Sequence, residues 1–363
     1  MSTQPVTATT QTRVKKPFVR RVAPDRSQRT RLAVQLAFAA LNVWLGAQFY
    51  LWVRFYERGG EGLAVPRPAG VEGWLPIAGL MNLKVLLFTG HVPAIHPAAL
   101  FLLIAFLAIS AIAKKAFCSW LCPVGTVSEY LGKLGQKIFG RRLRVPRWLD
   151  IPLRGLRYVL LGMFVVLIGS MTAASLNEFM GTPYGLIVDV KMLNFFRHMG
   201  ETSVIVIAAL TVLTVVVENV WCRYLCPYGA LMGLASLVSP LKIRRNVEAC
   251  IDCGKCAKAC PASLKVDKLV QIRSIECTAC MECVASCQTE GALQFSLAPG
   301  REAVQPRYRR AVTPLAMAAL VCGIFLAVVL FARATNHWQT NVPAGMYEQL
   351  VPIADQASHP GMH

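Results

Sequence analysis

Acidic residues are scarce in this chain of 363 residues: 19 are Asp or Glu, whereas 38 are Lys or Arg, which gives a formal net charge of +19. So basic a chain would suggest nucleic-acid binding if the cations formed one patch on a soluble domain. Here the cations flank long apolar runs instead. We therefore expect no nucleic-acid partner, and we expect the charges to orient the chain in a membrane.

The N-terminus lacks the apolar core of a cleavable signal peptide. Residues 1–31 are polar and carry eight Lys or Arg, and the pair Arg20-Arg21 is not followed by the apolar run of a twin-arginine signal. We expect residues 1–31 to form a disordered, basic cytoplasmic tail.

Polar residues are too few for an ordinary soluble protein, since 55% of the chain is hydrophobic and its mean hydropathy is +0.47. Several apolar runs approach the roughly twenty residues that cross a hydrocarbon core of about 30 Å. The segment 74–90 is shorter and interrupted, which favours a re-entrant or interfacial segment. The predicted spans are 32–53, 97–113, 156–176, 203–220 and 312–331.

The distribution of basic residues predicts the orientation of these spans. With the N-terminus inside, the cytoplasmic segments hold 31 Lys or Arg and the outer segments hold 7. By the positive-inside rule, we expect the N-terminus on the cytoplasmic side of a bacterial inner membrane and residues 334–363 in the periplasm.

Eight cysteines follow the spacing C-x2-C-x2-C-x3-C, written twice. In such runs three thiolates hold one 4Fe-4S cluster, while the fourth ligates the other cluster. Gln288 stands where the first run has Pro261, which loosens a turn but removes no ligand. We predict that cluster 1 is held by Cys250, Cys253, Cys256 and Cys287, and cluster 2 by Cys277, Cys280, Cys283 and Cys260.

Two plainer roles for these cysteines fit the spacing less well. Zinc prefers two separated C-x2-C pairs around one ion, and disulfides belong to oxidising compartments. We therefore expect residues 241–300 to form a cytoplasmic, bacterial-type 2[4Fe-4S] ferredoxin-like α+β domain, inserted between the fourth and fifth spans.

A second motif, C-x3-C-P, occurs at Cys118 and Cys122 and again, 104 residues later, at Cys222 and Cys226. The flanking aromatic, Leu, Pro and Gly positions also match. Four thiols meeting at the cytoplasmic face could hold a further metal centre or act as redox thiols. Alternatively, they are small residues that pack helices.

This repetition predicts the organisation of the membrane part. Residues 32–130 and 156–240 would be two parallel repeats of a two-span unit, joined by a basic cytoplasmic loop at 131–155. With the last span at 312–331, the expected fold is an all-α membrane protein of about five transmembrane helices that carries the inserted domain.

Four ionisable residues are candidates for a quinol site on the outer side: His96, His198, Lys84 and Asp189. Quinol oxidation needs a proton acceptor beside an apolar slot, and ionisable groups at membrane depth are functional suspects. The plainer alternative is that these residues are solvated at the membrane interface.

Paired C-x3-C-P motifs followed by two ferredoxin motifs resemble the membrane polyferredoxins typified by NapH, the membrane half of NosR and CcoG (FixG) proteins. The resemblance covers about residues 32–331. It implies a protein of the lipid bilayer that relays single electrons between a quinone pool or a cytoplasmic donor and a redox partner protein. Such a chain is a subunit rather than a self-contained enzyme.

The resemblance to CcoG-type proteins implies an alternative function. In that function the thiols reduce a metal ion such as copper or help to mature a respiratory metalloenzyme, since soft thiolates suit Cu(I). A redox-sensing or scaffolding role is a third alternative.

Overall fold

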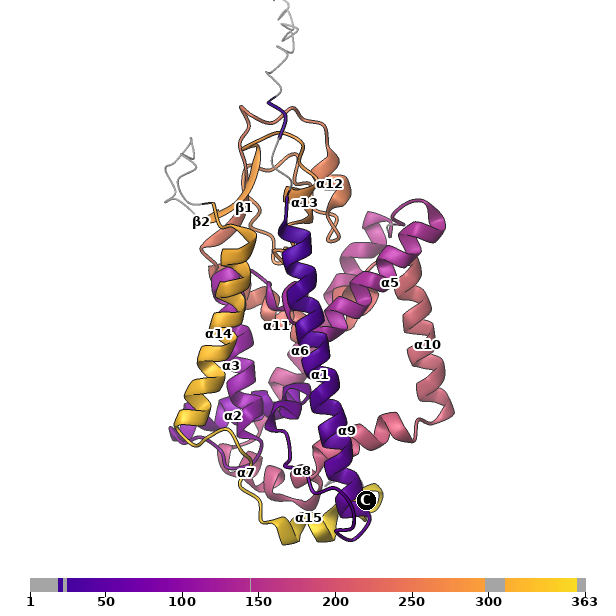
Figure 1. Cartoon of the computed structure of the whole chain (residues 1–363), viewed down its shortest axis with the longest axis vertical. Coiled ribbons are helices and arrows are strands. Elements are labelled where there is room, and N and C mark those ends of the chain that lie inside the picture. The colour runs from indigo at the N-terminus through magenta and orange to yellow at the C-terminus, as the bar shows by residue number, and fades with distance from the viewer. Residues whose placement is uncertain (1–18, 22–24, 144, 298–310, 358–363) are drawn as a thin grey trace, which may run out of the picture.

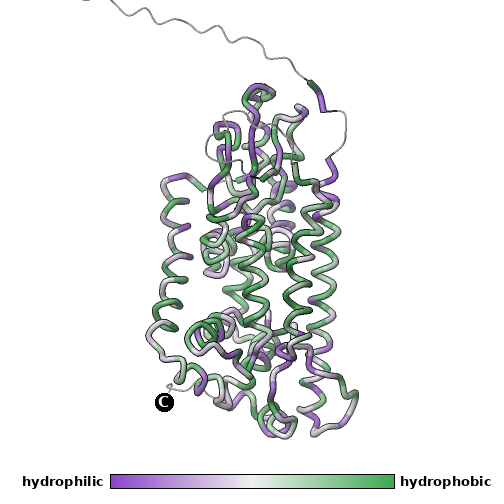
Figure 2. The backbone as a smooth tube through the Cα atoms, turned by 90° about the vertical axis from the view of Figure 1, so that its left-hand side faces the viewer, coloured by the Kyte–Doolittle hydropathy of each residue, from purple (hydrophilic) through white to green (hydrophobic). Residues whose placement is uncertain are grey.

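The computed structural model describes residues 19–21, 25–143, 145–297 and 311–357. Helices run along the long axis of the molecule, and a small cysteine-rich domain, residues 241–297, lies at one end (Figure 1). Hydrophobic residues predominate in the helices between the two ends (Figure 2). This distribution agrees with a protein that is embedded in a membrane.

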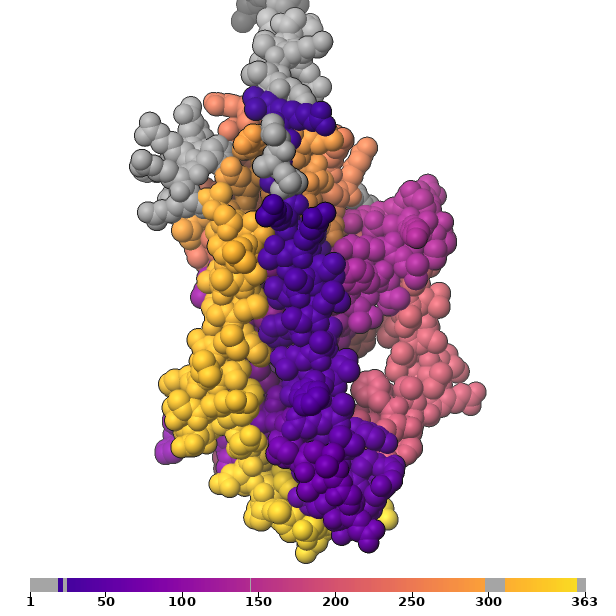
Figure 3. Space-filling view, viewed as in Figure 1, coloured from indigo at the N-terminus to yellow at the C-terminus, as the bar shows by residue number. Residues whose placement is uncertain are grey.

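Three helices in the described residues are long and apolar enough to cross a membrane: α1 (Ser27–Glu57), α6 (Arg147–Ser170) and α14 (Pro314–Ala334). A fourth candidate is the pair of α9 (Val188–Arg197) and α10 (Glu201–Val216), which is bent by 81°. Figure 3 shows α1 and α14 packed side by side, while α10 stands apart from them.

One of the five predicted spans is shorter than the others. α3 (Pro97–Ala113) begins and ends at the predicted residues, but its 17 residues extend only about 26 Å. Twelve of them are buried, and the helix packs between α14 and α2 (Pro76–Thr89). Its apolar composition therefore suits a protein interior as well as a bilayer. Among the residues that the structure describes there are three or four candidate spans, so a count of five stays a prediction.

The expected disorder of the N-terminal tail is not met at residues 19–21 and 25–31. Arg20 forms an isolated β-bridge with Thr289, and the backbone N–H of Arg21 donates to Gln288 at 2.8 Å. The carboxylate of Asp25 accepts from the N–H of Ser27 at 2.8 Å, where α1 begins. A polar composition gave no sign of these partners. Residues 1–18 and 22–24 lie outside the described residues.

The segment 74–90, predicted to be re-entrant or interfacial, begins at the last residue of a 3-10 turn, η1 (Ala69–Trp74), and then forms α2. Pro76 occupies the first position of α2, where its missing N–H is tolerated. A Cβ at Gly79 would lie 2.9 Å from the carbonyl oxygen of Ala99, so this glycine lets α2 pack closely on α3. Pro76 thus starts a helix and does not interrupt one.

Short elements close the end of the molecule opposite the cysteine-rich domain (Figure 1). They are α7 (Ala173–Gly181), α8 (Pro183–Leu186), α15 (Ala344–Leu350) and the 3-10 turn η4 (Ala354–Gln356).

The cysteine-rich domain has the predicted mixture of helix and strand. Its antiparallel strands, β1 (Leu241–Arg245) and β2 (Leu293–Leu297), pair in a register that places Ile243 opposite Phe295. Both of these side chains are buried. Two short helices, α12 (Lys255–Ala259) and α13 (Glu282–Ala285), complete the domain.

Candidate metal centres

The first C-x3-C-P motif spans the break between two helices. Cys118 lies in α4 (Phe117–Trp120), and Cys122 caps α5 (Pro123–Phe139) with an extended backbone. Pro123 is the first residue of α5, where its missing N–H is tolerated. The two thiols of the motif therefore do not lie on one continuous helix, because the chain turns at the second cysteine.

The second motif repeats this arrangement with a different turn. Cys222 lies in a π-helical turn, η2 (Trp221–Leu225), and Cys226 caps α11 (Pro227–Ala235). A 3-10 turn, η3 (Ser236–Val238), follows α11. Single π-turns within helical segments occur frequently at functional sites.

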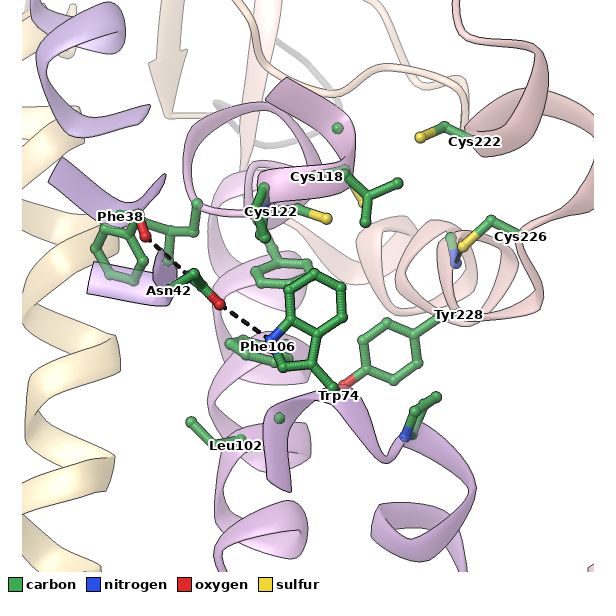
Figure 4. Close-up of a pocket in the computed structure, with 18 of the residues that line it drawn as sticks. Phe38, Asn42, Trp74, Leu102, Phe106, Cys118, Cys122, Cys222, Cys226 and Tyr228 are labelled. Atoms are coloured by element: carbon green, nitrogen blue, oxygen red, sulfur yellow. Dashed lines mark hydrogen bonds between the residues drawn. The ribbon is translucent and has the colours of Figure 1, made fainter. Parts of the chain in front are cut away.

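The four C-x3-C-P cysteines line one cavity of about 1090 Å³ (Figure 4). Burial raises the pKa of Cys118 to about 11 and that of Cys122 to about 12. Burial also raises the pKa of Cys222, and the other three thiols add to this effect. Such thiols stay protonated at neutral pH unless a metal ion displaces the proton.

Most of the cavity wall is apolar. Phe38, Leu102, Phe106 and Tyr228 line it beside the cysteines (Figure 4). The indole N–H of Trp74 donates to the amide oxygen of Asn42 at 3.1 Å, so these two polar groups of the apolar wall are hydrogen-bonded to each other. At its far end the cavity reaches Arg67 in the loop before η1.

The two C-x2-C-x2-C loops share an uncommon backbone conformation. In each loop the middle cysteine lies between two residues of positive φ, and three of these four residues carry a Cβ. Such strain is costly and typical of functional sites, and neighbouring N–H groups in such turns form nests that bind Fe-S groups. The residues are Asp252 (55°) and Gly254 (70°) around Cys253, and Ala279 (52°) and Met281 (59°) around Cys280.

Backbone N–H groups also hydrogen-bond to the thiols. Burial raises the pKa of Cys277 to about 11, and the N–H of Ala279 acts in the opposite direction. Burial likewise raises the pKa of Cys287, against the N–H of Thr289. Hydrogen bonds of this kind stabilise thiolates, which are the form that binds a cluster.

These eight cysteines lie in two groups of four. The second cysteine set, namely Cys260, Cys277, Cys280 and Cys283, lines one small cavity. Cys287 interacts electrostatically with Cys250 and Cys253, and Cys256 interacts with Cys287 and Cys250. We call these latter four the first cysteine set. The last cysteine of each run thus lies with the first three of the other run.

In the described residues, no three His, Cys, Asp or Glu side chains converge on a point that one metal ion could occupy. A 4Fe-4S cluster has a different requirement, because it is a multi-atom group bound by four thiolates around it. The strained loops, the N–H groups near sulfur and the grouping of the cysteines fit such a cluster.

The quinol-site candidates are only partly brought together. His96 is fully buried, with Nε2 2.9 Å from the carbonyl oxygen of Gly185. Asp189 lies nearby and binds Arg67 at 2.6 Å, and Arg67 also binds Glu72 at 2.8 Å. The Nδ1 atom of His96 is 3.3 Å from Glu72.

The other two candidates lie elsewhere. The ammonium of Lys84 donates to the carbonyl oxygens of Ile168 at 2.9 Å and Gly169 at 2.8 Å, near the end of α6. His198 is exposed, and its Nδ1 is 4.0 Å from Asp355.

Sequence reasoning missed Arg67 and Glu72. Burial disfavours the charged form of Glu72, but the charge of Arg67 and a hydrogen bond with His96 outweigh it and lower the pKa of Glu72 to about 2. One signal was present: Glu72 is the only acidic residue between Glu61 and Glu129.

Two family models match the chain. A 4Fe-4S binding domain matches residues 95–142 and 200–246, which contain the two C-x3-C-P motifs. A 4Fe-4S dicluster domain matches residues 242–288, which contain both ferredoxin motifs.

Several known proteins are similar in sequence. YccM of Escherichia coli, whose name proposes a role in electron transport, is 51% identical over 329 residues, which is 91% of each chain. The ferredoxin-type protein NapH of Escherichia coli is 30% identical over 58% of this chain and 71% of its own length. The regulatory protein NosR of Pseudomonas aeruginosa is 30% identical over 51% of this chain and 25% of its own. No solved structure matches.

Proposed function

Because this chain belongs to the membrane-associated polyferredoxin-type family that includes YccM, NapH and NosR, we propose that it relays single electrons through two 4Fe-4S clusters and a third centre. The two cysteine sets would hold the clusters, and the four C-x3-C-P cysteines would hold the third centre. We further propose that it does so in a bacterial inner membrane, with the cysteine-rich domain in the cytoplasm.

The convergence of the C-x3-C-P cysteines on one cavity carries this proposal. These cysteines come from segments 104 residues apart, and helix packing alone does not require that all four face the same space. The 4Fe-4S binding model that spans both motifs supports an iron-sulfur identity for the third centre.

A bound cluster supplies one-electron redox chemistry. The protein holds the thiols in place, excludes water by burial and supplies N–H groups near sulfur, which together set the reduction potential. Cys277 and Cys283 are buried, whereas Cys253 is exposed, so the two cysteine sets provide different environments.

A quinone is the electron partner that the cavity supports on the membrane side. The cavity combines an apolar wall with the C-x3-C-P thiols, which suits a lipophilic redox molecule. Its far end meets Arg67, which binds Asp189 and Glu72, and Glu72 contacts His96. His96 and Asp189 are therefore the better placed of the four quinol-site candidates, whereas Lys84 and His198 lie apart.

Metal analysis of purified protein tests the assignment. We expect iron and acid-labile sulfide equivalent to about three 4Fe-4S clusters, and about two after Cys118→Ser with Cys226→Ser. Cys322→Ser is the matched control, because Cys322 lies in α14 outside every motif, and it should keep all the iron. Zinc without iron or sulfide would contradict the proposal.

Oxidant choice tests the partner. The dithionite-reduced protein should be reoxidised faster by a short-chain quinone analogue than by Cu(II). Faster oxidation by Cu(II), lost in the Cys118→Ser variant, would favour the metal-reductase alternative instead.

A further inference from the structure

In the described residues, the helices and the segments between them hydrogen-bond to the cysteine-rich domain around its second cysteine set. The N-terminal segment 19–21 instead pairs with residues that follow Cys287, of the first set. Donors from α1 and from α4 bind backbone carbonyls within the stretch that begins at Cys277. Gln28 donates to the carbonyl oxygen of Cys280 at 3.0 Å, and the Trp120 indole donates to that of Ala279 at 3.2 Å. The hydroxyl of Ser119 donates to the carbonyl oxygen of Thr278.

The fourth cysteine of the second set, Cys260, is flanked by backbone carbonyls that bind arginine side chains. Carbonyls on either side of Cys260 accept hydrogen bonds from Arg142, Arg223 and Arg154, which lie outside the domain. The three accepting residues are Ala259, Pro261 and Ala262. The second cysteine set is therefore anchored at both of its segments.

The two cysteine sets also differ in how far their side chains are exposed to solvent. Cys260, Cys277 and Cys283 are buried, whereas Cys253, at the middle of the other loop, is exposed together with its neighbours Asp252 and Lys255. The first cysteine set thus contains the one exposed cysteine among the eight, Cys253, and it has no buried member.

The second set also adjoins the large cavity. Thr278, Cys280 and Pro261 line the same space as the four C-x3-C-P cysteines. Trp120 and Ser119 lie between Cys118 and Cys122 in sequence, and they bind the segment between Cys277 and Cys280. Each of these two hydrogen bonds therefore links the first C-x3-C-P motif directly to the second ferredoxin motif.

From these contacts, and resting on the function proposed above, we propose a fixed order of the redox sites. The first cysteine set exchanges electrons with a soluble one-electron carrier in the aqueous phase, and the second set connects to the C-x3-C-P cysteines through Trp120 and Ser119. Each electron that the carrier loses is gained by the protein, and the reverse holds for flow in the other direction. Trp120 is a positioning residue that joins the two motifs.

Paramagnetic relaxation tests the order. An EPR signal is first assigned to each set, as the signal altered by Cys253→Ser or by Cys280→Ser. A water-soluble dysprosium chelate added to the purified, reduced protein should then speed relaxation of the signal assigned with Cys253 severalfold more than that assigned with Cys280. Equal enhancement, or stronger enhancement of the Cys280 signal, would overturn the order.

Removal of the bridging donor tests the connection. Trp120→Phe keeps an aromatic ring but loses the N–H donor, and Ser119→Ala is the second variant if the first does not fold. Either should slow electron exchange between the cysteine-rich domain and the C-x3-C-P centre severalfold in freeze-quench EPR, with iron and sulfide unchanged. Trp148→Phe, at an exposed position of α6, is the matched control.

The outcomes separate this inference from the function on which it rests. Unchanged exchange rates in both bridging variants would refute the bridge while leaving the clusters established by their iron and sulfide. Absence of iron and sulfide in the unmodified protein would refute the proposed function itself.

Discussion

The guanidinium of Arg31, in α1, binds both carboxylate oxygens of Glu129, in α5, at 2.7 and 2.6 Å. Both side chains are buried. Because α5 starts at the first C-x3-C-P motif, this ion pair ties the N-terminal helix to the segment that carries Cys118 and Cys122.

Loss of one member of this pair should destabilise the protein more than loss of both. Arg31→Met leaves the Glu129 carboxylate buried, which costs about 3–5 kcal/mol for a fully buried pair. Lys133 also contacts Glu129 at 2.6 Å, so we expect the lower end of this range. The check is thermal unfolding in detergent of Arg31→Met, Glu129→Leu and the double variant. Additive losses in the double variant would show that the two residues are not coupled.

The glycines that follow the two C-x3-C-P motifs at equivalent positions should tolerate alanine differently. A Cβ at Gly125 would lie 2.1 Å from the backbone oxygen of Cys118, whereas a Cβ at Gly229 would lie 3.5 Å from that of Cys222 and 3.4 Å from the flexible end of Lys115. Gly125→Ala should therefore destabilise the protein by about 3 kcal/mol or more and lower its iron content. Gly229→Ala, the matched control, should change either quantity little. Equal effects in thermal unfolding and iron analysis would contradict the packing described here.

Glu218 should make stability depend on pH. Burial raises its pKa to about 7 against the charge of Arg142, from an ordinary value of 4.5, and its Oε1 has no hydrogen-bond partner. An acid with a raised pKa contributes stability below pH 4.5, and the contribution is lost as the pH rises through 7. The loss is at most about 3 kcal/mol.

The variant Glu218→Gln should therefore be more stable than the unmodified protein at pH 8 and nearly equal to it at pH 4.5. Unfolding temperatures measured across this range provide the check. Glu248→Gln, at an exposed position, should leave the profile unchanged. A Glu218→Gln profile parallel to that of the unmodified protein would mean that another group titrates.

Lys84 should act in stability and not in electron transfer. Its ammonium donates to carbonyls at the end of α6, including that of Met171, and hydrogen bonds to charged groups contribute about 1.5–3 kcal/mol. Lys84→Met should lower the unfolding temperature without changing the rate of quinone reduction or its pH profile. The exposed Lys137 gives a control, Lys137→Met. A changed pH profile with unchanged stability would return Lys84 to the quinol site.

The sequence predicted well what depends on local spacing. The apolar run at 32–53 lies within α1, and all but the first two residues of the run at 312–331 lie within α14, because a continuous apolar stretch acts within a few turns of chain.

Contacts between distant segments could not be predicted in this way. The burial of α3 depends on α14, some 200 residues later, and the binding of Asp189 by Arg67 joins α9 to the loop before η1, which share no motif. Nothing in the two matching ferredoxin motifs indicated that the carbonyl oxygens between Cys277 and Cys280 would be the ones bound by Ser119 and Trp120. Such contacts depend on tertiary packing, which the spacing of cysteines and apolar residues does not predict.

The left-handed turn at Ala279 and Met281 also bears on how the protein is assembled. The positive-φ backbone of this loop costs free energy when no metal group is bound. Binding of a metal group offsets that cost, because the free energy of metal binding contributes to folding. The carbonyls that Trp120 and Ser119 bind belong to this same loop. We therefore expect iron insertion to precede the docking of the domain onto the helices, so that chains that have not received iron keep their cysteine-rich domain undocked and open to proteolysis.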